Sequence, residues 1–63
     1  MQEWQKRVVD EHNEIVARLT SLSEFVKTKD YTNLSAINRH LVDEQLALMH
    51  KYERLLELII SIF

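Results

Sequence analysis

The chain contains neither glycine nor proline among its 63 residues. Glycine supplies the left-handed conformations of tight turns and proline ends helices, so the usual helix breakers are missing. Cysteine is absent too, which excludes a disulfide framework and a thiolate zinc site. Because so short a chain buries little surface, we predict one all-α domain over residues 1–63 that gains stability by self-association.

The first half of the chain has the spacing of an amphipathic helix. Large apolar residues recur every three, four or seven positions, at Met1, Trp4, Val8, Ile15, Leu19, Leu22 and Val26. At about 100° per residue these side chains form one stripe, and the charged residues face largely away from it. The pattern predicts a helix over about residues 2–28.

The second half carries two apolar lines on one predicted helix, which covers about residues 35–62. The first line contains Leu34, Ile37, Leu41, Leu48, Tyr52, Leu55, Ile59 and Ile62. The second line follows seven-residue spacing through Val42, Met49, Leu56 and Phe63, with Ile60 beside it. We expect the first line to face the first helix. Another chain is expected to cover the second line, because two apolar lines on one helix are hard to leave in water.

The helical pattern breaks over about residues 29–34, which we predict as a turn. Turn and N-cap formers gather there, at Asp30, Thr32, Asn33 and Ser35. Two helices of about 27 residues joined by a short turn pack antiparallel. The sequence therefore predicts an antiparallel two-helix hairpin and a homo-oligomer, with a dimer that forms a four-helix bundle favoured. The substitution Leu56→Glu is then expected to dissociate the oligomer.

Candidate contact residues lie on the second line, near it, and at the chain ends. For a partner protein or a second chain they are Trp4, Val42, Gln45, Met49, Tyr52, Leu56, Ile60 and Phe63. His12 and Gln45 interrupt apolar lines and are expected as buried polar residues. His12 is either a neutral core histidine, hydrogen-bonded to Tyr52 or another chain, or a pH-sensitive contact. Gln45 either fixes the register between helices or lines a polar pocket.

No motif for catalysis or metal binding is present. The chain lacks a Ser-His-Asp spacing that a hairpin could bring together, a glycine-rich phosphate loop and a cysteine nucleophile, so no enzyme and no catalytic residue is predicted. His40 and Glu44 lie one helical turn apart, but two ligands are too few for zinc. We therefore expect no metal and no cofactor.

Charge and hydropathy argue against nucleic acid and membrane as partners. The net charge is −2 and each basic residue lies near acidic ones, so a nucleic-acid footprint is missing. The N-terminus is too polar for a signal peptide, and the apolar run at residues 55–63 has about half the length that spans a bilayer. With the absence of cysteine, these features indicate a cytoplasmic protein.

A scattered set of residues matches the pattern of a known group of proteins. These are Trp4, Gln5, Arg7, Val8, Glu11, Phe25, Gln45, Met49, Tyr52 and Leu55. With this skeleton the chain resembles small helical proteins encoded by tailed bacteriophages and prophages. Its length and style resemble the short early-region proteins of lambdoid phages, from the interval between the exonuclease and excisionase genes. His12, Ile59 and Ile60 depart from the pattern.

The resemblance implies an early-expressed accessory protein without enzymatic activity, acting on host physiology or on the lysis–lysogeny choice. The leading interpretation is therefore a non-enzymatic regulator that binds a host or phage protein. Two alternatives stay open. One is a nucleic-acid-binding regulator on the same bundle, and the other is a helical oligomer that sequesters a small ligand.

Overall fold

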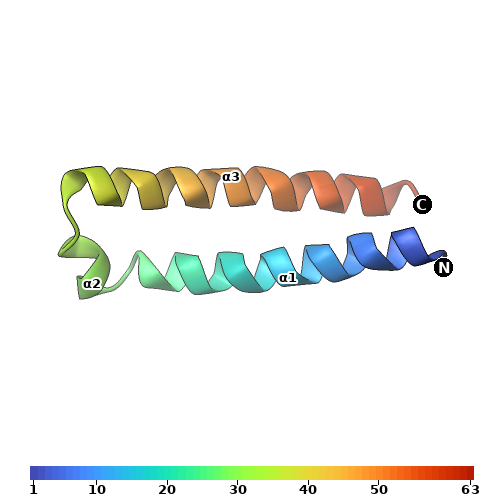
Figure 1. Ribbon diagram of the computed structural model, residues 1–63, viewed down its shortest axis with the longest axis horizontal. Helices are drawn as coiled ribbons and strands as arrows, with labels where there is room; N and C mark the ends of the chain where they lie inside the picture. Colours follow the sequence, from blue (N-terminus) through green and yellow to red (C-terminus); the bar gives the residue numbers. More distant parts are fainter.

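The protein consists of two long helices, a short third helix and no strand. The computed structural model describes residues 1–63, with α1 at Glu3–Phe25, α2 at Lys29–Thr32 and α3 at Ala36–Ser61. The helices α1 and α3 lie side by side and run in opposite directions, with both termini at one end (Figure 1). The Cα atoms extend over 45 × 14 × 14 Å. The all-helical class that the sequence predicts is confirmed.

The connection differs from the predicted turn because part of it is helical. The helix α1 ends at Phe25 rather than near residue 28, and α2 follows within the reversal. The Thr28 hydroxyl caps α2 by accepting from the Tyr31 N–H at 3.3 Å, and the Ser35 hydroxyl caps α3 by accepting from the Asn38 N–H at 3.2 Å. No residue has a positive φ. Two capped helix starts therefore reverse the chain without a left-handed residue.

Tyr31 closes the turn end of the helix pair. Its ring meets Phe25 edge to face with ring centroids 6.1 Å apart. Its hydroxyl donates to Asp43 Oδ1 at 2.6 Å, which ties α2 to the first turns of α3. This hydrogen bond to a carboxylate is the largest cause of the raised pKa of Tyr31, followed by its partial desolvation. The short helix is therefore fixed to both long helices through one side chain.

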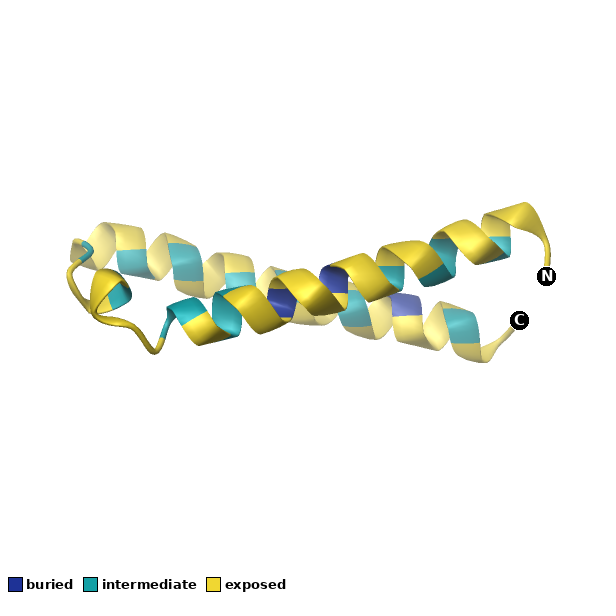
Figure 2. Ribbon diagram, turned by 90° about the horizontal axis from the view of Figure 1, so that it is seen from below, coloured by how far each residue is buried: buried dark blue, intermediate teal, exposed yellow.

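The buried core is thin. Only Ile15, Leu19 and Leu56 are buried, at 9%, 9% and 4% exposure. Figure 2 shows these positions as isolated spots on two ribbons that are otherwise half-buried or exposed. None of the three helices combines the length and apolar composition that a bilayer crossing requires.

α3 packs on α1 with the face that carries the second apolar line, whereas the first line was predicted to make this contact. The contact face is made of half-buried or buried residues, namely Val42, Leu46, Met49, Glu53, Leu56 and Ile60. The line expected to face α1 is exposed instead, with Ile37 at 75%, Leu48 at 64% and Ile62 at 83%. The expectation that Leu55, Ile59 and Ile62 face the first helix is therefore wrong.

The packed face is mostly apolar and includes one polar contact with α1. Glu53 lies on this face, and His12 of α1 lies opposite it. The exposed line instead contains Gln45 and Tyr52, whose polar groups are better placed near water. Because Leu56 is the most buried residue of the chain, Leu56→Glu would put a charge inside the α1–α3 contact. It is expected to unfold the chain rather than to dissociate an oligomer.

Candidate functional site

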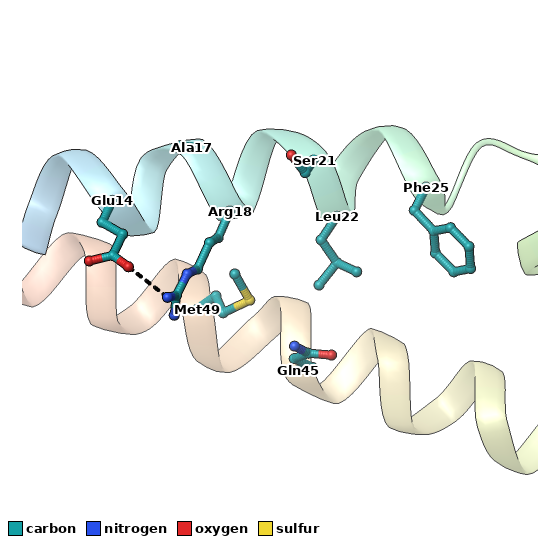
Figure 3. Close-up of a pocket in the computed structure, with 8 residues that line it drawn as sticks. All are labelled: Glu14, Ala17, Arg18, Ser21, Leu22, Phe25, Gln45 and Met49. Atoms are coloured by element: carbon teal, nitrogen blue, oxygen red, sulfur yellow. Dashed lines mark hydrogen bonds and ion pairs between the residues drawn. The ribbon is translucent and has the colours of Figure 1, made fainter.

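A groove of about 470 Å³ lies between α1 and α3 in the half of the molecule nearer the turn (Figure 3). Its lining residues are Glu14, Ala17, Arg18, Ser21, Leu22, Phe25, Gln45 and Met49. Leu22 projects from α1 toward α3, and the side chain of Met49 projects from α3 toward α1 (Figure 3). The volume falls within the range of about 300–1,000 Å³ that is typical of small-molecule sites.

The groove combines an apolar surface with a few polar groups. Leu22, Phe25 and Met49 are half-buried and supply apolar surface. Arg18 Nη2 donates to Glu14 Oε1 at 2.6 Å, which leaves other guanidinium N–H groups free to meet a ligand. This ion pair is exposed and contributes no more than about 1 kcal/mol. The groove therefore suits a partly apolar molecule that carries hydrogen-bond acceptors.

Tyr52 links the two long helices through an exposed hydrogen bond. Its hydroxyl donates to a carboxylate oxygen of Glu11. This hydrogen bond is the largest cause of the raised pKa of Tyr52, with smaller contributions from desolvation and from the negative charge of Glu11. The partner of Tyr52 is thus Glu11, and the hydrogen bond to His12 that the sequence suggested is not formed.

His12 and Glu53 form a polar contact inside the α1–α3 packing. His12 Nε2 and Glu53 Oε2 lie 3.8 Å apart, and each side chain is 22% exposed. Both atoms are shielded from solvent and make no hydrogen bond. The contact therefore acts as an ion pair when the imidazole is protonated.

Glu57 lies close to the same two side chains. Ligand atoms of His12, Glu53 and Glu57 all lie within 4.8 Å of one another, which brings together metal-ligand residues that the sequence had left apart. Glu57 is exposed and accepts a hydrogen bond from Arg54 at 3.1 Å. The sequence analysis considered only His40 and Glu44, one turn apart on one helix, and judged two ligands too few for zinc. The pairing of His12 with Glu53 depends on how two helices face each other.

The predicted contact residues are divided among several places. Four of them, Val42, Met49, Leu56 and Ile60, pack toward α1. Trp4 meets Phe63 edge to face at the end where both termini lie, with ring centroids 5.3 Å apart. Gln45, predicted as a buried polar residue on the inner or partner-facing side, is exposed in the single chain and lines the groove.

Sequence reasoning missed Arg18, Leu22 and Phe25 as groove residues. Leu22 and Phe25 carry the helical period of a packing face, and Arg18 has an acid one turn away, so none of them stands out from its neighbours. The signal that could have found them is which residues of the two antiparallel helices lie side by side. The antiparallel arrangement brings this stretch of α1 beside Gln45 and Met49.

The comparisons with known proteins give one match. The family model described as Sequestin matches residues 2–58, which is most of the chain. No curated protein and no solved structure matches.

Proposed function

The chain belongs to the Sequestin family, and we propose that it is a non-catalytic binding protein that sequesters a small ligand in the groove between α1 and α3. The groove is the observation that carries this proposal, since it is an open site of ligand-sized volume and is lined by both apolar and polar side chains. The family description supports retention of a molecule rather than its conversion. It names no ligand.

The groove residues define the chemistry of the ligand. A flat or partly apolar body would lie against Leu22, Phe25 and Met49. Acceptor or anionic groups would meet the free guanidinium N–H groups of Arg18 and the amide of Gln45. Host metabolites and nucleotides include molecules of this class.

The charges at the groove support binding without chemistry. Its titratable side chains are Glu14 and Arg18, which are exposed and hydrogen-bonded to each other. Glu14 is 62% exposed and is held by Arg18, so the groove presents no enclosed acid or base to a ligand. This arrangement favours a protein that holds its ligand unchanged.

Thermal shift and calorimetry with a panel of host metabolites and nucleotides test the proposal. A ligand at one hundred times its Kd should stabilise the fold by about 2.7 kcal/mol. Arg18→Ala should weaken binding about tenfold or more, because the donors to the acceptor groups are lost.

Arg54→Ala provides a matched control. Arg18 and Arg54 are 66% and 65% exposed, and each pairs with a glutamate of its own helix, but Arg54 lies outside the groove. Equal losses of affinity in both variants, or a panel without any stabilising compound, would contradict a ligand site in the groove.

The exposed apolar line of α3 favours a second candidate, a regulator that acts by protein–protein interaction. In this reading the chain is a phage accessory protein in the host cytoplasm, as the sequence resemblance implies, and α3 docks into a groove of a host or phage protein. The test compares capture from host extract by the wild type, by Leu48→Glu and by Ala47→Glu. A partner of this kind should be lost with Leu48→Glu alone, because Ala47 points away from the apolar line.

A further inference from the structure

The exposed apolar residues of α3 form a coiled-coil seam. Leu41, Leu48, Leu55 and Ile62 recur every seventh residue, and Gln45, Tyr52 and Ile59 recur between them. This alternation of four and three is the spacing of helices that pair through knobs-into-holes packing. We call these seven residues the outer seam. Leucine occupies three of the four positions in the first set, as in many paired helices.

The outer seam is large enough for a stable interface. It runs along nearly all of α3, a helix of 26 residues. Its apolar members, with the neighbouring Ile37 and Leu58, are between 38% and 83% exposed, so the seam offers a continuous apolar surface to a partner. A chain with three buried residues has little other stabilisation, so the uncovered seam marks an interaction surface.

The outer seam and the face that packs on α1 lie side by side around α3. At about 100° per residue, their centres are roughly a quarter turn apart. A second α3 placed antiparallel on the seam, with two-fold symmetry, puts both α1 helices on the same side of the α3 pair. The four helices then occupy the corners of a square, as in a four-helix bundle. No rearrangement of the α1–α3 contact is needed.

The edge of the seam that faces away from α1 has a self-complementary charge pattern. Ile37, Glu44, Lys51 and Leu58 recur there every seventh residue, in the order apolar, acidic, basic, apolar. In an antiparallel pair, this edge of one helix lies along the same edge of the other. Glu44 then lies opposite Lys51 of the second copy, and Ile37 lies opposite Leu58 of the second copy. Neither Glu44 nor Lys51 has an ion pair within its own chain.

A parallel pair offers no such match. In parallel coiled coils this edge faces the opposite edge of the partner, which here consists of Val42, Met49 and Leu56. Those residues already pack toward α1. We therefore propose that a second copy of this chain packs antiparallel on the outer seam, with Glu44 of each copy opposite Lys51 of the other.

Sedimentation of the full chain and its variants tests whether a second copy covers the outer seam. The wild type should sediment as a dimer at micromolar concentration. Leu48→Glu should sediment as a monomer with its helix content largely kept, because Leu48 makes no contribution to the buried core. Ala47→Glu adds the same charge one residue away and should leave the dimer intact. A wild-type monomer at the highest soluble concentration, or a Leu48→Glu dimer, overturns the proposal.

Charge reversal at low salt tests the register. Glu44→Lys places two like-charged pairs across the seam by symmetry, and should raise the Kd of the dimer about tenfold. Lys51→Glu should have a similar effect. The double variant Glu44→Lys/Lys51→Glu exchanges the charges and should return the Kd to within about threefold of the wild type. Equal Kd values for all four proteins overturn the register.

Cross-linking tests whether the two α3 helices are antiparallel. Because the chain has no native cysteine, only the introduced cysteines react. Glu44→Cys and Lys51→Cys chains are mixed, refolded together and treated with a short bismaleimide. An antiparallel pair should yield mainly the mixed 44–51 product, because like positions are separated by a heptad along the seam. Predominance of the two like-with-like products indicates a parallel pair and overturns the proposal.

Discussion

His12 and Glu53 show how one polar contact is accommodated within an apolar interface. Their facing atoms are shielded from water and lack other partners, so each group depends on the other. Removing one partner leaves an unmatched group, whereas removing both leaves an apolar contact. The contact is therefore expected to influence specificity of pairing more than net stability.

The first prediction follows from this dependence. His12→Leu should lower the free energy of unfolding by about 1–3 kcal/mol, because the Glu53 carboxylate is then partly buried without a partner. His12→Leu/Glu53→Leu should lie within about 1 kcal/mol of the wild type or above it. Urea denaturation followed by circular dichroism measures both values. A double variant as unstable as the single one would argue against the pairing.

The second prediction concerns alkaline pH. The hydrogen bond from Tyr52 to Glu11 raises the pKa of Tyr52 above its ordinary value of 10.0. A raised folded-state pKa contributes stability that is present below pH 10 and is lost as the pH rises through the higher pKa. Absorbance titration of phenolate should show a late-titrating tyrosine that Tyr52→Phe removes.

Tyr31 sets the background for that titration. Its pKa is also raised, by the hydrogen bond to Asp43, so one late tyrosine should remain in Tyr52→Phe. The double variant Tyr31→Phe/Tyr52→Phe has no tyrosine left, because the chain contains two. An unchanged upper titration in Tyr52→Phe would contradict the contact with Glu11.

At the level of elements, α3 has two apolar faces with different roles. The residue spacing predicted two apolar faces on this helix, because the period of the side chains follows from helical geometry. It predicted the wrong face toward α1, because each face alone satisfies the same period. Likewise the N-cap formers predicted where the chain reverses but not that Thr28 would start a short helix. The groove and the His12–Glu53 contact depend on the choice of face, which explains why sequence reasoning missed them.

The third prediction distinguishes the two faces. Leu56→Ala should lower the free energy of unfolding by about 2–4 kcal/mol at any protein concentration, because Leu56 is 4% exposed against α1. Leu48→Ala should change it by less than about 0.5 kcal/mol in dilute solution, where the chain is monomeric. Denaturation at low concentration, followed by circular dichroism, compares the two. Equal losses would mean that both faces are covered within a single chain.

At the level of the whole molecule, three buried residues in a chain of 63 leave little stability to a single copy. If a second copy covers the outer seam, association adds to the stability of the folded single chain, and the two equilibria are linked. The fourth prediction is that the midpoint of thermal unfolding rises by about 5 °C for each tenfold increase in protein concentration. Scanning calorimetry over a hundredfold range measures this, and Leu48→Glu should remove the dependence.

Gln45 belongs both to the ligand groove and to the outer seam. A molecule that contacts this amide therefore changes the same surface that a second chain would cover. By thermodynamic reciprocity, a ligand that shifts the dissociation constant of the dimer by some factor has its own affinity shifted by that factor on dimerisation. The concentration of the protein in the cell would then set the fraction of dimer, and with it the affinity of each copy for its ligand.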